Sequence, residues 1–377
     1  MSEGLAIYVH WPFCSRICPY CDFNVYKQKD EINLIPAILT DLSFWRVWTG
    51  PRSVTSIHFG GGTPSLMSSE DIYSVISRIK SLWNLKLSCE ITLEANPIDM
   101  NKERWEAYAK SGVNRLSLGV QSFYDVALKN LGRDHNSVQA KRSIELAKNT
   151  FPSVSIDLIF GWKGQDELLL HNDITEAIKT GVDHISTYQL TIEEGTAFHK
   201  SEIRGNKKSV TADQSADFYD TIVEKLISAG FEHYEVSNFA KLSHQSQHNL
   251  TYWKGLDYVG VGPGAHGRVT LHNSRYSTIS KMRPQDYMQN IELMGHGLET
   301  REKLSPQEWS SEYIIMGLRV DNGISIQKYE ALSGQSLPKQ KINNFVDNGF
   351  LLIEGDKLST SRKGRNVLDH ITREILI

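Results

Sequence analysis

The sequence predicts an α/β fold: an incomplete TIM-like (β/α)6 barrel followed by a C-terminal winged-helix-like domain. From residue 5 to about 195, short apolar runs alternate with helical patterns, which is typical of βα units around a parallel sheet. After about residue 230 this alternation stops, and the order of elements changes. A chain of 377 residues with 40% hydrophobic residues can bury a full-sized core, so we expect one large domain with a smaller one.

The predicted strands of the barrel are short runs that read as buried or half-buried. They are residues 6–11, 54–60, 89–96, 115–122, 154–161 and 184–191. Two helices between them carry terminal signals: residues 68–83 begin with a capping Ser and acidic residues, and residues 101–112 end in a glycine. A longer amphipathic helix is predicted over residues 211–230.

The predicted domains are the barrel over residues 1–230, a Gly-rich and aromatic connecting segment over 231–300, and the C-terminal domain over 301–377. In the last domain, two or three short helices run into GFLLIEGDKLSTS, which reads as two strands joined by a Gly-Asp turn. A final helix follows. This order of elements is that of a winged-helix domain.

Charge and composition disfavour several classes of protein. The formal net charge is −3, and basic and acidic residues are nearly balanced within residues 301–377, whereas DNA readers of the winged-helix type carry a basic excess. We therefore predict no nucleic-acid partner and expect the C-terminal domain to dock on the barrel or on a partner. No signal-peptide pattern and no apolar stretch of about 18 residues occurs. A cytoplasmic protein is expected, with peripheral membrane contact or an organellar location left open.

Three of the four cysteines lie in the stretch YVHWPFCSRICPYCDF, as Cys14, Cys18 and Cys21. Structural zinc requires a closed set of four ligands, and no fourth ligand stands near this C-x3-C-x2-C motif, since His10 belongs to the pattern of the first strand. Cys89 shares strand parity with the apolar residues around it and is expected to face the helices. Three thiolates on a 4Fe-4S cluster leave one iron open to a small molecule. Buried structural thiols are the alternative, but these rarely gather within eight residues.

Polar groups at the ends of the predicted strands mark a candidate site, because such groups in a parallel barrel usually serve one. Gly61 and Gly62, followed by Thr63, allow a ligand to approach the backbone closely, although a plain tight turn is the alternative. Gln121 is expected to point into the barrel. Glu94 and Asp157 are carboxylates on otherwise buried runs, where a structural Arg partner is the other interpretation; these observations leave both interpretations open.

Several motifs, in order along the chain, together resemble a known superfamily. They are YVHWPFCSRICPYCDFN, GGGTPS, LEANP, GVQSF, LGRDHN, IDLIFG and HNLTYW. The cysteine motif after a first strand and the glycines after a second resemble the radical S-adenosylmethionine superfamily. More narrowly, from residue 5 to the end, the chain resembles the group that contains oxygen-independent coproporphyrinogen III dehydrogenase and the heme chaperone HemW.

This resemblance implies a radical S-adenosylmethionine barrel with two cofactors. The 4Fe-4S cluster would be held by Cys14, Cys18 and Cys21, with S-adenosylmethionine at its open iron. The positions that would contact S-adenosylmethionine are Tyr8, Tyr20, Gly61, Gly62, Thr63, Glu94, Gln121, Arg133 and Asp157. Tyr20 has a second interpretation, since an aromatic side chain beside a cluster can simply shield it from water.

The departures from the dehydrogenase favour the chaperone. The dehydrogenase has another cysteine two residues after the third ligand, where this chain has Phe23, and it has a longer segment before the first strand, where this chain has only seven residues before Tyr8. The HNLTYW motif implies heme binding through His248, Asn249, Tyr252 and Trp253, with the porphyrin held away from the radical site.

Alternatives remain for the heme ligand and for the partners. His248 can instead be a hydrogen-bonded structural residue, and His244, His266 and His272 are other candidates for binding the iron. The implied partners are heme and a heme-accepting protein; a respiratory, membrane-associated acceptor and a homodimer are left open. The alternative function is oxygen-independent coproporphyrinogen III oxidation in porphyrin biosynthesis.

Overall fold

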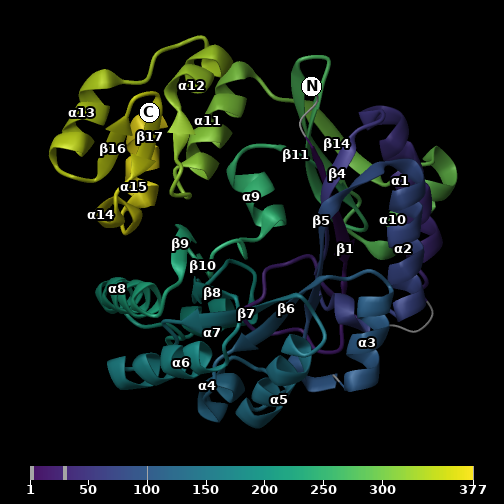
Figure 1. Ribbon diagram of the computed structural model, residues 1–377, viewed down its shortest axis with the longest axis horizontal. Helices are drawn as coiled ribbons and strands as arrows, with labels where there is room; N and C mark the ends of the chain where they lie inside the picture. Colours follow the sequence, from purple (N-terminus) through teal and green to yellow (C-terminus); the bar gives the residue numbers. More distant parts are fainter. Residues whose placement is uncertain (1–3, 29–31, 100, 377) are drawn as a thin grey trace.

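A twelve-stranded mixed sheet forms the body of the protein in the computed structural model, which describes residues 4–28, 32–99 and 101–376 (Figure 1). Its strand order is β14-β13-β12-β11-β1-β4-β5-β6-β7-β8-β10-β9. Six neighbouring strands pair in parallel, namely β1 (Leu5–Trp11), β4 (Ser53–Gly61), β5 (Asn84–Ala95), β6 (Arg115–Gln121), β7 (Ser153–Phe160) and β8 (His184–Gln189). They are the six strands predicted from the sequence. Within the described ranges the two ends of the sheet do not pair with each other, so the barrel is open as predicted.

Helices connect the parallel strands and cover the outside of the sheet (Figure 1). They are α1 (Ile35–Thr49), α2 (Ser69–Leu82), α3 (Lys102–Lys110), α4 (Asp125–Asn130), α5 (Ser137–Lys148) and α6 (Glu167–Lys179), with 3-10 turns at η1 (Pro64–Leu66) and η2 (Pro97–Asp99). After β8 come α7 (Ala197–Ile203) and α8 (Ala212–Ser228), and α8 packs against α6. The capping Ser predicted before α2 is Ser68, which forms a reciprocal capping box with Asp71. In the described parts of the chain, no helix combines the length and apolar composition needed to cross a bilayer.

The segment 231–300 does more than connect two domains, because it builds both edges of the sheet. At one edge β11 (Asp257–Val261) pairs in parallel with β1 and is followed by the antiparallel strands β12 (His266–Leu271), β13 (Ser274–Ser280) and β14 (Leu298–Lys303). At the other edge lie β10 (Asn238–Ala240) and β9 (Glu232–Glu235). The helices of this segment are α9 (Gln247–Trp253) and α10 (Pro284–Met294). These strands were not predicted from the sequence, and the domain boundaries themselves stay a prediction.

The main apolar core lies between the sheet and its outer helices. Leu5, Ile7 and Val9 on β1 are fully buried, as is Trp45 on α1. Removing each such side chain from water stabilises the fold by roughly 1.5–3 kcal/mol. This layer leaves the polar residues on the other face of the parallel strands free to line the interior of the barrel.

The C-terminal domain has its own apolar cluster and the predicted order of elements. These are α11 (Pro306–Gly317), β15 (Ile324–Ser325), α12 (Ile326–Ser333), α13 (Lys339–Asp347), β16 (Leu351–Glu354), β17 (Lys357–Thr360), α14 (Arg362–Arg365) and α15 (Leu368–Leu376). The two predicted strands pair as β16 and β17 across the Gly-Asp turn.

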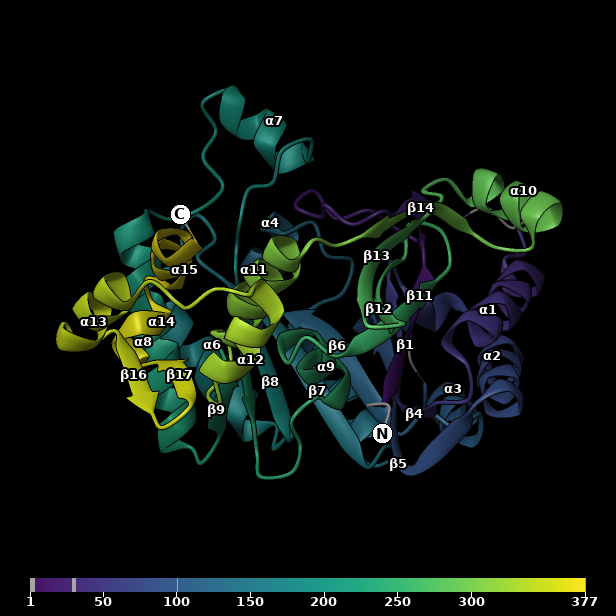
Figure 2. The same cartoon turned by 90° about the horizontal axis from the view of Figure 1, so that it is seen from above.

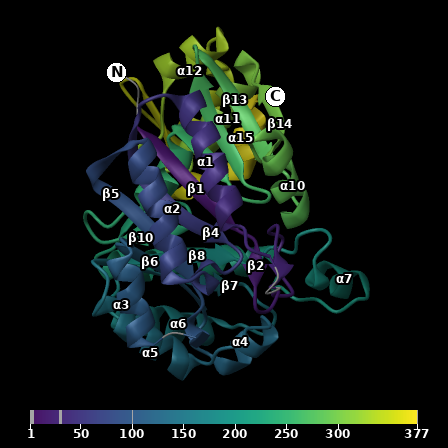
Figure 3. The same ribbon diagram turned by 90° about the vertical axis from the view of Figure 1, so that its right-hand side faces the viewer.

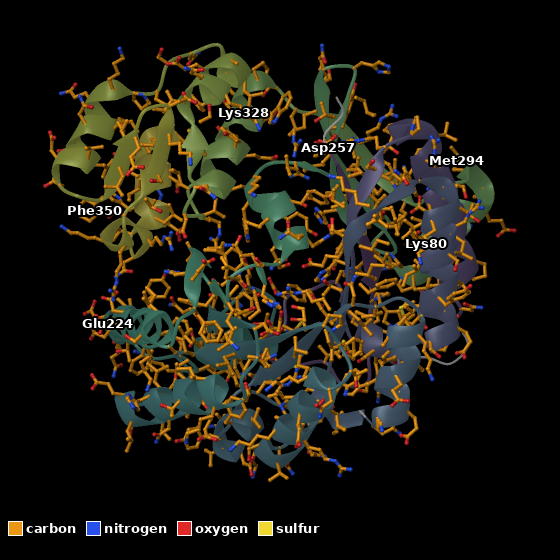
Figure 4. All side chains as sticks on the ribbon, viewed as in Figure 1. Lys80, Glu224, Asp257, Met294, Lys328 and Phe350 are labelled. Atoms are coloured by element: carbon orange, nitrogen blue, oxygen red, sulfur yellow. The ribbon has the colours of Figure 1, made fainter. Side chains whose placement is uncertain are left out.

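The C-terminal domain docks on the barrel through charged residues. Arg362 lies 3.0 Å from Glu224 on α8, which Figure 4 shows beneath this domain. Arg319 lies 2.7 Å from the fully buried Glu235 of β9. The locally basic SRKGR segment therefore pairs partly with the barrel, and the expected docking is confirmed.

Candidate functional site

The three clustered cysteines lie on the loop that follows β1. Cys14 ends the two-residue strand β2 (Phe13–Cys14), which pairs with β3 (Tyr26–Lys27) and thereby closes the base of the loop. The amide of Cys21 donates to the carbonyl of Cys18 at 3.1 Å, which tightens the turn between them. All three thiols line one cavity of about 380 Å³, here called the cysteine cavity.

The surroundings of the thiols fit a cationic metal cluster. Burial raises the pKa of Cys14 and brings that of Cys21 to about 11. A metal that binds such thiols takes the place of their protons. The guanidinium of Arg133 donates to Cys18 Sγ at 3.2 Å and places a positive charge beside the sulfur. Among the described residues, no group of three His, Cys, Asp or Glu side chains converges on a single metal ion. The cysteines of a 4Fe-4S cluster bind different irons and need not converge in that way.

Cys89 lies apart from this loop. It is buried in the main core on β5, and burial raises its pKa to about 12. Its thiol contacts the carbonyl of Glu90 at 3.8 Å and does not line the cysteine cavity. The predicted orientation of Cys89 toward the helices is therefore confirmed.

The glycines after β4 bring the backbone close to the cysteine loop. The amide of Gly62 donates to the Trp11 carbonyl at 2.7 Å, and that of Thr63 donates to the Phe13 carbonyl at 2.8 Å. Gly61 has a φ of +106°, and a Cβ there would lie 2.5 Å from the His10 ring, so no other residue fits. This segment is a close approach between two strand ends and more than a plain tight turn.

Among the residues that the structure describes, the two interior carboxylates have no Arg partner of the kind that the structural alternative requires. Glu94 lies 2.9 Å from His58 Nε2 and accepts from the Gly61 amide at 3.3 Å. Asp157 accepts from Ser117 at 3.2 Å, and burial raises its pKa to about 6 despite hydrogen bonds from serines. In the described parts of the chain, neither forms an ion pair with an arginine. Both carboxylates line the cysteine cavity.

Gln121 adopts a backbone conformation that is unusual for its type. Its φ is 66°, and the pairing of β6 with β7 shifts register just before it. A non-glycine residue in the left-handed region is strained, and such strain gathers at functional sites. The bend directs Gln121 into the cysteine cavity, as predicted from the strand alternation.

The structure thus brings together eight of the nine positions expected to contact S-adenosylmethionine. They are Tyr20, Gly61, Gly62, Thr63, Glu94, Gln121, Arg133 and Asp157. Tyr20 also packs with Phe198 of α7, and the Phe198 amide donates to the Pro19 carbonyl at 2.9 Å. Figures 2 and 3 show α7 standing out from the body beside the cysteine loop. Asn96, which accepts from Arg133 at 3.2 Å, was not predicted from the sequence. Its place at the end of β5 was the signal that could have found it.

The ninth position, Tyr8, lines a second cavity of about 520 Å³, here called the aromatic cavity. Its wall includes Tyr252, Trp253, Tyr258 and Trp309. The two cavities adjoin, because both walls contain Asp22, Phe23, Gly61 and Glu94. The expectation that a porphyrin at the HNLTYW motif is held away from the radical site stays a prediction, and the shared wall disfavours it.

The HNLTYW motif forms α9, which lies between the barrel and the C-terminal domain (Figure 1). Of its predicted heme contacts, Tyr252 and Trp253 line the aromatic cavity, whereas His248 and the half-buried Asn249 line neither cavity. His248 is 1% exposed, and its two ring nitrogens hydrogen-bond to Ser56 at 2.9 Å and to Tyr252 at 2.7 Å. In this conformation no lone pair of His248 is free for iron, which agrees with the structural alternative for this residue.

Comparisons with known proteins place these features in a family. The model of the Radical SAM superfamily matches residues 8–180, and that of the HemN C-terminal domain matches residues 304–367. The heme chaperone HemW of Escherichia coli is 33% identical over 97% of this chain and 97% of its own length. The mitochondrial radical S-adenosyl methionine domain-containing protein 1 of Bos taurus is 35% identical over 100% of this chain and 88% of its own length. The solved structure of coproporphyrinogen III oxidase (HemN) from Escherichia coli, 18% identical, covers 99% of this chain and 90% of that one with a TM-score of 0.81, which indicates a shared fold.

Proposed function

Because this chain belongs to the radical S-adenosylmethionine family that includes the heme chaperone HemW, we propose that it binds heme and transfers it to an acceptor protein. The observation that carries the proposal is the aromatic cavity beside the cysteine cavity. Its volume of about 520 Å³ lies within the usual range for ligand sites. Its aromatic walls suit a flat macrocycle, since tyrosine and tryptophan rings stack on such faces.

Within this proposal, the cysteine cavity holds a 4Fe-4S cluster and S-adenosylmethionine. Cys14, Cys18 and Cys21 are the proposed cluster ligands, and the positive charge of Arg133 offsets part of the negative charge of the thiolates. Gly61 and Gly62 offer backbone at close approach, while Glu94 and Asp157 offer carboxylates to the cationic sulfonium and amino groups of S-adenosylmethionine. The bound cofactors supply one-electron chemistry at the sulfonium, and the chain's own residues orient them and exclude water.

The acceptor and the setting are also proposals. The acceptor is a separate heme-accepting protein, and a respiratory acceptor at the membrane fits a chain that meets it from the cytoplasm. A carrier must release its cargo on a useful timescale. The aromatic cavity suits this requirement, because Phe23 on its wall is 62% exposed and the site therefore opens toward solvent. A homodimer is compatible with this scheme.

The second candidate function is oxygen-independent oxidation of coproporphyrinogen III. The shared fold with HemN and the adjoining position of the two cavities favour it, because a porphyrin precursor in the aromatic cavity would lie beside the radical site. Phe23, at the position where the dehydrogenase has cysteine, speaks against it.

The test uses the full chain, reconstituted anaerobically with iron and sulfide. Hemin is titrated into one sample, and a second receives coproporphyrinogen III, S-adenosylmethionine and a reductant. If the protein is a heme chaperone, we expect a Soret band that saturates at one equivalent of hemin, transfer of that heme to an added apo-acceptor, and no protoporphyrinogen IX. Turnover to protoporphyrinogen IX would reject the chaperone in favour of the dehydrogenase.

A further inference from the structure

Heme bound in the aromatic cavity requires a side chain that can bind its iron. Two histidines are found among the described residues of the cavity wall, His10 and His266. The ring of His10 is buried, and its nitrogens hydrogen-bond to Tyr8 Oη and to the Asn24 carbonyl, each at 3.0 Å. His10 is therefore occupied on both sides, as His248 is behind Tyr252.

His266 differs from both of these residues. It begins β12, is exposed, and forms no side-chain hydrogen bond to any residue in the described parts of the chain. Partial burial, and then the charge of Arg268, lower the pKa of His266 from its ordinary value of 6.5, so the ring is neutral at pH 7. A neutral imidazole with a free lone pair is what a heme iron takes as axial ligand.

The backbone around His266 places the residue at the wall of the aromatic cavity. His266 pairs with Ile279 in the β12–β13 hairpin. His266 and Arg268 stand two residues apart on β12, so both side chains lie on the same face, and both line the aromatic cavity. Arg268 binds the Glu312 carboxylate of α11 through Nε at 3.0 Å and Nη2 at 2.8 Å. The strand that carries His266 is thereby tied to α11, which also lines the aromatic cavity.

We propose that His266 is the axial ligand of heme iron in the aromatic cavity, and that His248 is a positioning residue for Tyr252. This inference rests on the proposed heme-binding function. The iron ligand then lies outside the HNLTYW motif, and the motif forms part of the wall of the heme site. Tyr252 and Trp253 face the porphyrin, and His248 hydrogen-bonds to the Tyr252 hydroxyl at 2.7 Å.

The test compares ligand variants of the full chain by hemin titration and by electron paramagnetic resonance of the ferric complex. We expect His266→Ala to bind hemin at least tenfold more weakly and to lose the signature of histidine ligation. We expect His266→Gly to recover that signature when imidazole is added, because the smaller side chain leaves room for it, and His266→Cys to show a thiolate-ligated spectrum. His248→Gln should keep histidine ligation. The matched control is His171→Ala, an exposed histidine on α6 outside both cavities.

The outcomes separate the ligand from the function. If wild type binds one equivalent and His266→Ala keeps its affinity within twofold and its spectrum, the ligand assignment is wrong while heme binding stands. Loss of ligation in His248→Gln, with His266→Ala unaffected, would assign the iron to His248. If His266→Gly loses the signature of histidine ligation and added imidazole does not restore it, His266 has only a structural role and the ligand assignment is wrong. Weak, unsaturable binding by wild type would reject the proposed function itself.

Discussion

Replacing Gly62 by alanine should damage the cysteine site while the fold persists. Gly62 lies where the end of β4 meets the cysteine loop, and its φ is not in the left-handed region, so alanine causes no backbone strain there. The effect is purely steric. An added Cβ would lie 2.6 Å from the Phe13 carbonyl oxygen and 3.0 Å from Cys14 Sγ.

The magnitude follows from these distances. The Cβ and the carbonyl must move apart by at least 0.4 Å to reach 3.0 Å, which is the lower limit of real contacts (3.0 minus 2.6). That carbonyl also accepts the Thr63 amide at 2.8 Å, so the shift stretches a hydrogen bond as well as moving the thiol. Overpacking of this kind costs about 1–3 kcal/mol. If the free protein relieves about 2 kcal/mol of this strain by shifting the segment, and S-adenosylmethionine binds only to the unshifted segment, the affinity falls roughly 30-fold.

The assay measures iron and sulfide after anaerobic reconstitution, and then S-adenosylmethionine binding by calorimetry. We expect Gly62→Ala to hold less iron and to bind S-adenosylmethionine about 30-fold more weakly, with an unchanged circular dichroism spectrum. Gly364→Ala is the control for a steric clash with backbone away from the site, because its Cβ would meet the Phe350 carbonyl in the C-terminal domain. Wild-type iron content together with affinity within twofold of wild type in Gly62→Ala would refute the placement of the ligand against this segment.

Four further outcomes are expected. Cys89→Ser should leave the iron content unchanged and Cys18→Ser should abolish the cluster; the reverse pattern would reject the ligand assignment. S-adenosylmethionine should bind only to cluster-loaded protein in calorimetry, and equal binding to cluster-free protein would remove the open-iron argument. Burial raises the pKa of Asp157 from 3.8 to about 6, so between these two pH values the folded state binds a proton that the unfolded state does not, and the free energy of unfolding falls as pH rises. In Asp157→Asn this fall, which is on the order of 3 kcal/mol, should disappear from the free energy of unfolding measured with urea at each pH. An unchanged pH profile in the variant would contradict the shift. Trp253→Ala should weaken hemin binding about threefold to tenfold by loss of stacking, and a smaller change would place the porphyrin elsewhere.

The fold could be predicted where local patterns were strong. The six parallel strands and helices such as α2 and α8 have clear alternation, periodicity and caps, and they formed as predicted. The extra strands β11 to β13 were missed for a physical reason. β11 is short and contains Gly260, and the two-residue turn between β12 and β13 uses His272 and Asn273 with φ of 47° and 61°. Such a turn needs positive φ at both positions, and its usual signal, Asn-Gly, is absent.

The functional site, like the fold, could be predicted from the sequence only in part. Groups at the ends of neighbouring parallel strands must meet at one edge, so the cysteine cavity could be predicted from strand order alone. The orientation of α9 could not, because it depends on a contact across 158 residues: Glu90 on β5 accepts from the amide of His248 at 3.0 Å and from that of Gln247 at 3.1 Å. This contact fixes the start of the helix against the sheet and turns His248 inward. Nothing in the HNLTYW motif itself indicates that Glu90 is its hydrogen-bond partner.

The common wall of the two cavities has a thermodynamic consequence for the proposed function. Phe23 and Glu94 belong to both walls, so a ligand that moves either residue in one cavity changes the shape or charge of the other. Coupling between two sites is reciprocal: if S-adenosylmethionine alters the affinity for heme by some factor, heme alters the affinity for S-adenosylmethionine by the same factor. Each ligand is therefore titrated with and without the other, and the two coupling factors obtained in this way must agree. Two unequal factors would mean that at least one ligand also binds elsewhere, whereas equal factors different from one would show that the two sites are coupled.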